Sequence, residues 1–134
     1  MPKHGWEGTA TVKAVRKPSS LELAWAAGFL EGEGCFSVPS RIFVTQVGKE
    51  SLLHLQEVFG GYVGDRIGGP KKSGELRQYS VWEVHGSRAR GIMMTVYKFM
   101  SARRRTRINE VLGHATASAP TKEHANARSQ NHSP

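Results

Sequence analysis

Cysteine is almost missing from this chain of 134 residues, which contains Cys35 and no other. One cysteine cannot form an intramolecular disulfide, and a lone thiol with six scattered histidines lacks the paired spacing of a structural zinc site. The sequence therefore argues against a disulfide-stapled secreted domain. It favours a protein of a reducing compartment inside the cell, such as the cytoplasm, the nucleoid or an organelle matrix.

Long apolar runs are missing as well. The longest, from Leu23 to Leu30, is far shorter than the roughly 20 residues that cross a bilayer. The first residues, MPKHGWEG, do not contain the apolar core of a secretory signal. We therefore expect neither secretion nor a membrane partner.

Acidic residues are scarce, because 11 Asp and Glu face 19 Lys and Arg, giving a net charge of +8. The excess is concentrated between residues 86 and 134, which hold nine basic and two acidic side chains, including arginines at 103, 104, 105 and 107. Such clustering favours a polyanionic partner. A solvated helix face is the simpler alternative.

The chain is long enough for one domain, predicted over residues 18–113 between a basic extension (1–17) and a disordered tail (114–134). Gly and Pro signals and apolar periodicity predict the elements within it. Helices are expected at 20–31, at 49–59, from residue 86 onward and at 103–112, and strands at 35–47 (a hairpin turning at Pro39-Ser40), 61–67 and 76–84. This order indicates an α+β fold with a four-stranded antiparallel sheet and helices on one face.

The first predicted helix carries a stripe of small residues. Ala24, Gly28 and Gly32 recur every four positions and so line one face of the helix. A face without bulky side chains lets another backbone approach closely. The sequence leaves two partners open, namely this chain's own sheet or a helix of a second chain.

Two glutamates, Glu31 and Glu33, stand at the carboxyl end of the same helix. The helix dipole is negative there, so an anion is unfavourable unless a cation joins it. Glu33 is flanked by glycines, and its carboxylate together with the Gly32 carbonyl could bind a hard divalent cation that activates water. A solvated glutamate is the plain alternative.

Residues 26–34, AAGFLEGEG, resemble the LAGLIDADG motif of homing endonucleases, with Ala for the first Leu and Glu for both Asp. The following order of elements is also similar: a hairpin ending in VTQ, a helix ending in FG, a second hairpin opening with GYV, and two helices with a basic patch between them. The resemblance covers about residues 21–112. The single motif is similar to the branch of the family that acts as a homodimer.

The resemblance implies an αββαββα fold and a site-specific endonuclease that hydrolyses phosphodiester bonds of double-stranded DNA at a long, pseudo-palindromic site, with Mg²⁺ or Mn²⁺. Genes of this type stand in introns, inteins or phage genomes. By position, Ala24, Gly28 and Gly32 would form the dimer interface. Glu33, with the Gly32 carbonyl, would bind the metal, Gln46 would orient solvent, and Arg103 would stabilise the developing phosphate charge, beside Arg104 and Arg105. Glu31 would be structural.

The predicted sheet has two faces, and in the family the open face lies in the major groove. Alternation predicts that eight residues face the helices: Phe36, Val38, Ile42, Val44, Val63, Ile67, Tyr79 and Val81. The open face would then carry Cys35, Ser37, Arg41, Phe43, Thr45, Tyr62, Arg66, Gln78 and Ser80.

We expect DNA contacts from Ser37, Arg41, Thr45, Arg66, Gln78 and Ser80, with Arg66 and Gln78 reading bases and Lys71 and Lys72 contacting phosphates. Phe43 stands where the family has a polar reader. A solvated sheet face is the alternative reading of this surface.

Three other functions remain open. A DNA-binding regulator that does not cleave, or an intron maturase that binds RNA, would keep the basic surface and the dimer helix. A structural α+β module without a nucleic acid would need no basic cluster.

Overall fold

The computed structural model describes residues 17–118. The predicted N-terminal extension up to residue 16 and the tail from residue 119 lie outside the described residues. The chain runs in the order α1 (Ser20–Glu33), β1 (Cys35–Ser37), β2 (Arg41–Gln46), α2 (Glu50–Phe59), β3 (Tyr62–Pro70), β4 (Leu76–His85), α3 (Gly86–Val96), η1 (Tyr97–Phe99) and α4 (Ala102–Ser118). This confirms the predicted α+β class.

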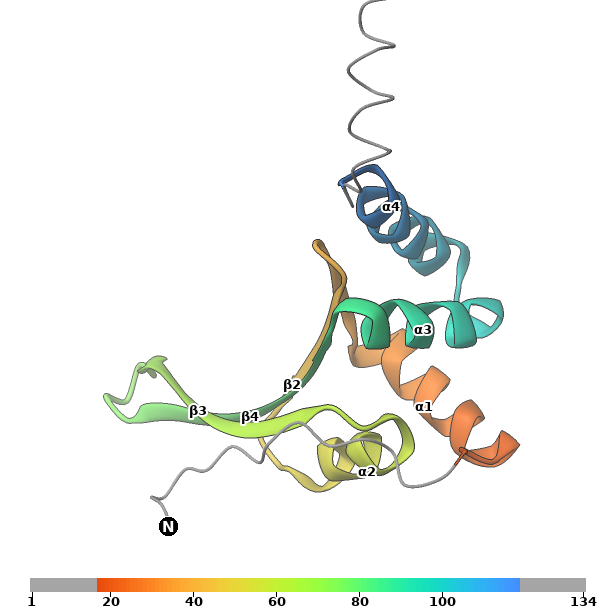
Figure 1. Cartoon of the computed structure of the whole chain (residues 1–134). Helices are drawn as coiled ribbons and strands as arrows, with labels where there is room; N and C mark the ends of the chain where they lie inside the picture. The colour runs from red at the N-terminus through yellow and green to blue at the C-terminus, as the bar shows by residue number, and fades with distance from the viewer. Residues whose placement is uncertain (1–16, 119–134) are drawn as a thin grey trace, which may run out of the picture.

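The four strands form one antiparallel sheet in the order β1-β2-β4-β3. The helices α1, α2 and α3 lie on the same side of this sheet (Figure 1). In the register, Val44 of β2 and Val63 of β3 both stand opposite Trp82 of β4. Because paired residues of antiparallel strands point to the same face, these three side chains face the helices together.

Trp82 is the centre of the hydrophobic core. It is fully buried, and its indole Nε1 donates a hydrogen bond to the Gly60 carbonyl at 2.9 Å. The core around it combines sheet and helix residues: Ala26, Ala27, Leu30, Phe36, Ile42, Val44, Leu52, Leu55, Val58, Val63, Val84, Ala89, Ile92, Met93, Val96, Met100, Ile108 and Val111. Every helix contributes to this list, so one core holds the whole domain.

The start of α1 is fixed by a capping box. The Ser19 hydroxyl accepts a hydrogen bond from the Glu22 amide at 3.1 Å, and the Glu22 carboxylate accepts one from the Ser19 amide at 2.9 Å. Two amides that a helix leaves without intrahelical partners are satisfied in this way. Ser19 is therefore the N-cap of α1.

The first hairpin turns where the sequence predicted, at Pro39 and Ser40. The Val38–Pro39 bond is cis and Ser40 has a φ of 65°. The Ser40 carbonyl accepts a hydrogen bond from the Gly86 amide at 2.8 Å, and its hydroxyl accepts one from Arg90 at 2.9 Å. These contacts join the turn to the start of α3.

The predicted end of α1 at Glu31 is wrong, because the helix continues through Gly32 to Glu33 and Gly34 is its C-cap. A Cβ atom at Gly34 would lie 2.8 Å from the Leu30 carbonyl oxygen, whereas one at Gly32 would have no neighbour within 4 Å. Gly34 is therefore the glycine that the helix end requires.

The predicted end of the last helix at Leu112 is also wrong. Helix α4 begins at Ala102 and runs through Gly113 to Ser118, so residues 114–118 of the predicted tail are helical. Gly113 is exposed, and a single glycine costs an exposed helix only about 1 kcal/mol. The boundary at residue 113 therefore does not separate domain from tail.

Two further element predictions need correction. Strand β3 extends to Pro70 rather than residue 67, which shortens the loop before β4. The helix predicted from residue 86 onward does not continue regularly: α3 ends at Val96 and is followed by the 3₁₀ turn η1, where Phe99 is 47% exposed. The tighter turn changes the phase at which side chains meet the sheet.

The predicted sheet faces are right for β2 but reversed for β4. Ser80 stands opposite Gln46, and Val81 stands opposite Thr45, so Ser80 shares the helix-side face and Val81 the open face. By the same register, Tyr79 is on the open face and Gln78 on the helix side. Adjacent apolar residues in SVWEV left the alternation ambiguous, and the register resolves it.

Besides Tyr79 and Val81, two further residues predicted to meet the helices do not do so. Val38 lies in the hairpin turn and is 42% exposed, and Ile67, in the projecting part of β3, is 66% exposed. Figure 1 shows the β3–β4 hairpin extending beyond the helices. Alternation places Ile67 on the helix-side face, but no helix reaches that far along the strand.

Candidate nucleic-acid interface and acidic helix end

Glu33 and Gln46 lie together, as the sequence predicted for the candidate catalytic residues. The Gln46 Nε2 donates a hydrogen bond to the Glu33 Oε1 at 3.1 Å. Glu33 is the last residue of α1 and Gln46 the last residue of β2. The end of the helix and the end of the strand therefore meet at one exposed carboxylate.

The metal ligands within one chain are few. Between residues 17 and 118 the structure contains no group of three His, Cys, Asp or Glu side chains that could hold a metal ion. Glu33 supplies one carboxylate, and the neighbouring Gly32 carbonyl is at the helix end. Both are the hard oxygen donors that Mg²⁺ and Mn²⁺ prefer, so the types of donor fit such an ion.

Glu31 connects α1 to the beginning of α4. Its Oε1 accepts a hydrogen bond from the Ser101 amide at 2.9 Å, and its backbone carbonyl accepts one from the Arg104 Nε at 3.1 Å. The hydrogen bond from the Ser101 backbone lowers the pKa of Glu31, and the positive charges of Arg104 and Arg103 lower it further. These contacts suit the structural role predicted for Glu31.

The arginines of α4 lie in different environments. Arg105 donates to the carbonyls of Tyr97 and Lys98, at 3.2 and 2.9 Å, and Arg104 lies over the Phe36 ring as well as donating to Glu31. Arg103 is exposed and lines a surface hollow beside Gly34, the residue after Glu33. Arg104 lines the same hollow, but its Nε already donates to the Glu31 carbonyl.

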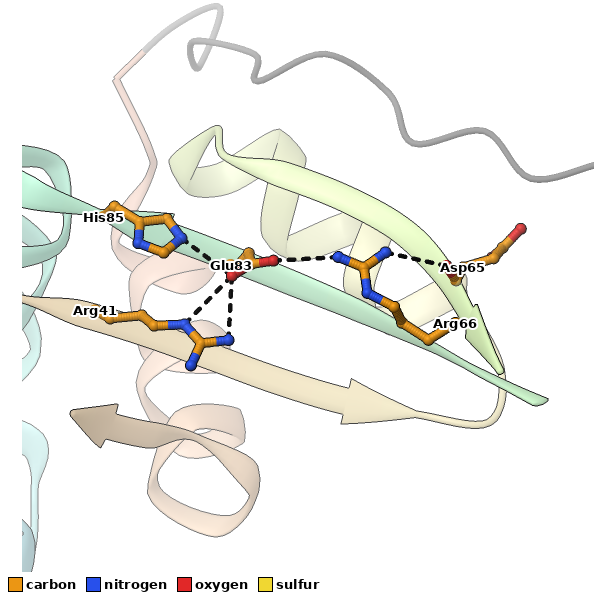
Figure 2. A network of polar contacts seen from close by, with 5 residues as sticks. All are labelled: Arg41, Asp65, Arg66, Glu83 and His85. Carbon is orange, nitrogen blue, oxygen red and sulfur yellow. Dashed lines mark hydrogen bonds and ion pairs between the residues drawn. The ribbon is translucent and has the colours of Figure 1, made fainter. Parts of the chain in front are cut away.

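The open face of the sheet carries a charged cluster that sequence reasoning missed in part. Glu83 of β4 accepts from Arg41 (Nε at 3.3 Å, Nη2 at 3.2 Å) and from Arg66 (Nη2 at 3.4 Å), and His85 Nε2 lies 3.0 Å away (Figure 2). Arg41 and Arg66 were predicted from their residue type. Glu83 and His85 were missed because the alternation predicted for β4 was reversed, and in that phase both residues would face the helices.

The remaining predicted DNA contacts separate into two groups. Ser37, Thr45, Lys71 and Lys72 lie on the open face or in the exposed loop between β3 and β4. Ser80 does not, because it is 4% exposed and its hydroxyl donates to the Asp65 Oδ1 at 2.9 Å. The prediction that Ser80 and Gln78 lie on the open face beside Arg66 is therefore wrong.

Asp65, like Ser80, lies on the helix-side face of the sheet. Lys49 pairs with its carboxylate at 3.1 Å. Burial acts to raise the pKa of Asp65, but the hydrogen bonds from Lys49 and Ser80 and the charges of Lys49 and Arg66 together lower it. The contacts join the beginning of α2 to the sheet, which indicates a structural role.

The small-residue stripe faces solvent. Ala24, Gly28 and Gly32 are all exposed, and a Cβ atom at either glycine would have no neighbour within 4 Å. The sequence left open whether the stripe packs on the chain's own sheet, and in the structure it does not. Ala26, Ala27 and Leu30 pack there instead.

Comparison of the chain with protein-family models, curated proteins and solved structures found no match. None of the helices in residues 17–118 is both long and apolar enough to cross a membrane.

Proposed function

We propose that this chain is a divalent-metal-dependent endonuclease that cuts double-stranded DNA as a homodimer. The observation that carries the proposal is the placement of Glu33. It follows directly on the exposed stripe of Ala24, Gly28 and Gly32 and is hydrogen-bonded to Gln46. The resemblance of residues 26–34 to the LAGLIDADG motif supports the same reading.

The exposed stripe gives the geometric reason for a dimer. Two α1 helices that pack through their glycines can approach more closely than helices with bulky side chains. Glu33 stands one residue beyond Gly32, so the two copies of its carboxylate would meet at the end of the interface. A metal site that is incomplete in one chain would then have ligands from both.

The chemistry follows from the residues around this point. A bound Mg²⁺ or Mn²⁺ would supply an activated water and neutralise charge on the phosphate. Glu33 and the Gly32 carbonyl would hold the ion, and the Gln46 amide would orient solvent beside it. Arg103 would place a fixed positive charge near the phosphate that accumulates negative charge during hydrolysis.

The test compares cleavage and binding by the wild type and by Glu33→Gln, which keeps the shape of the side chain but removes its charge. We expect the wild type to cut members of a randomised duplex pool with Mg²⁺ or Mn²⁺. Glu33→Gln should bind the same duplexes but cut them at least about 100-fold more slowly, because several kcal/mol of charge stabilisation is lost.

Glu57→Gln is the matched control, because Glu57 is an exposed glutamate of α2 with no role in the proposal. It should cut like the wild type. Tight binding by the wild type without cleavage in either metal would contradict the proposal and favour the non-cleaving regulator. Preference for single-stranded RNA over duplex DNA would favour the maturase.

A further inference from the structure

A row of three residues crosses the open face of the sheet. In the register of the strands, Phe43 of β2 and Tyr62 of β3 both stand directly opposite Glu83 of β4. The row thus places one carboxylate between two aromatic rings. Neither ring faces the helices, because Phe43 and Tyr62 alternate with the buried residues Ile42, Val44 and Val63.

Each ring of this row supports an arginine. The Arg41 guanidinium lies over the Phe43 ring at 4.1 Å from its centroid, and the Arg66 guanidinium lies over the Tyr62 ring at 5.6 Å. Both distances are within the range of cation–π attraction. Each arginine therefore contacts an aromatic ring with its guanidinium and forms an ion pair with Glu83.

Glu83 holds both groups at once. Its Oε1 accepts from Arg41 and its Oε2 from Arg66, so one carboxylate fixes two guanidinium groups on opposite sides (Figure 2). The Glu83 side chain is only 15% exposed, whereas those of Arg41 and Arg66 are 35% and 36% exposed. The acid is thus largely covered, and the two cations remain accessible.

Gly64 makes room for this arrangement. It lies between Tyr62 and Arg66 on the same face of β3, and a Cβ atom there would collide with the Tyr62 ring. The Tyr62 side chain can therefore extend along the strand toward Arg66. A larger residue would displace the ring on which Arg66 rests.

We propose that Glu83 is a positioning residue that presents Arg41 and Arg66 to duplex DNA as a fixed pair of guanine-reading groups. Arginine donates to the N7 and O6 atoms of guanine in the major groove. An arginine held in place loses less side-chain entropy on binding than a mobile one. Phe43, which replaces a polar reader, then serves as the support for Arg41.

The structure also limits how far apart the two guanines can be. The Nη2 atoms of Arg41 and Arg66 lie 3.2 and 3.4 Å from the two oxygens of the same carboxylate, so these two nitrogens are less than about 9 Å apart. This corresponds to about three base-pair steps of 3.4 Å. Each half of the recognised site should therefore contain two guanines within that spacing, on either strand.

This inference rests on the proposed function only in requiring that the chain bind duplex DNA. Its test is selection from a randomised duplex pool with the full chain in EDTA, so that no cleavage occurs, followed by sequencing of the bound DNA. The wild type should enrich two closely spaced guanines. Glu83→Gln, which keeps the shape but loses the charge, should enrich them about 10-fold less while still binding the unselected pool.

Glu75→Gln is the matched control for charge. Glu75 is an exposed acid of the loop before β4 that pairs with Lys71, so its loss raises the net charge equally without touching either arginine. It should bind the pool as Glu83→Gln does and keep the guanine preference. Glu83→Asp retains the charge but is shorter by one methylene, and should also lose preference.

Three outcomes overturn the inference for a chain that binds duplex DNA. These are a wild type that binds duplex without guanine preference, a Glu83→Gln variant with the wild-type preference, and an equal loss of preference in Glu75→Gln. If the chain cleaves DNA in Mg²⁺ in any of these cases, the proposed function stands and the role of Glu83 falls. If it binds no duplex at all, both fall. Thermal unfolding of each variant separates loss of preference from loss of fold.

Discussion

At the scale of single residues, the glycines of the motif have different tasks. Gly34 is buried, and the space for a side chain is taken by the Leu30 backbone. Gly28 is exposed within the same segment, and nothing in the chain restricts a side chain there. One motif therefore contains a glycine that the fold of the single chain requires and another that it does not.

Substitution by alanine should separate these two glycines. Gly34→Ala should lower the free energy of unfolding by about 1–3 kcal/mol, because the Leu30 carbonyl must move. Gly28→Ala should raise it by roughly 0.5–1 kcal/mol through improved helix propensity. Urea unfolding of the dilute, monomeric chain measures both, and equal effects of the two variants would contradict the assignment.

Sequence alone predicted neighbours that depend on local order along the chain, and the chemical roles of these residues stay predictions. Glu33 and Gln46 could be paired through the motif and its following hairpin. Glu83 could not be found in this way, because its role depends on the register that places it opposite Phe43 and Tyr62. The misplacement of Ser80 has the same origin, since Val81 and Trp82 are both apolar and alternation could not choose between them.

At the scale of the elements, a glutamate fixes each end of α1, and the two glutamates do so through different contacts. Glu22 completes the capping box at the start of the helix. At its end, the Glu31 carboxylate accepts a hydrogen bond from the amide of Ser101, in the segment before α4. The second contact links elements that are 70 residues apart in the sequence. It places the basic residues of α4 beside the acidic end of α1.

The link between α1 and α4 should depend on pH. The folded-state pKa of Glu31 is lowered from 4.5, so its contribution to stability is fully present above that value. It is lost as the pH falls from about 4.5 through the folded pKa, because protonation weakens the hydrogen bond from Ser101. Urea unfolding should show a difference between the wild type and Glu31→Gln at pH 6 that shrinks below pH 4.

A difference between these two proteins that stays constant across this range would contradict the assigned role of Glu31. Glu57→Gln, which changes an exposed acid of α2, is the control for the general loss of negative charge.

The elements themselves followed from the sequence more closely than their ends. Apolar periodicity with the Gly and Pro signals located the four α-helices and four strands of residues 17–118 but missed η1, and α1 continues through Gly32 and α4 through Gly113. A glycine in a helix costs about 1 kcal/mol, which tertiary contacts offset. Helix α1 ends at Gly34 because the Leu30 backbone leaves no room for a side chain there. The sequence alone does not show this contact.

At the scale of the whole molecule, the two candidate surfaces differ in charge. The stripe on α1 is uncharged and exposed, which suits contact with a second copy of the chain. The open face of the sheet carries Arg41 and Arg66 around one acid, which suits a polyanion. Because Glu33 stands at the end of the stripe, the proposed reaction centre requires two chains.

A mixed dimer tests this claim most directly. One wild-type subunit and one Glu33→Gln subunit, carrying different affinity tags, are coexpressed and purified through both tags. Cleavage of both strands of a duplex that the wild type cuts is then measured in Mg²⁺. We expect the mixed dimer to form and to cut both strands about 100-fold or more slowly than the wild-type dimer. A mixed dimer that cuts both strands at the wild-type rate, or a chain of 14.7 kDa that cuts both strands as a monomer, would contradict the requirement for two chains.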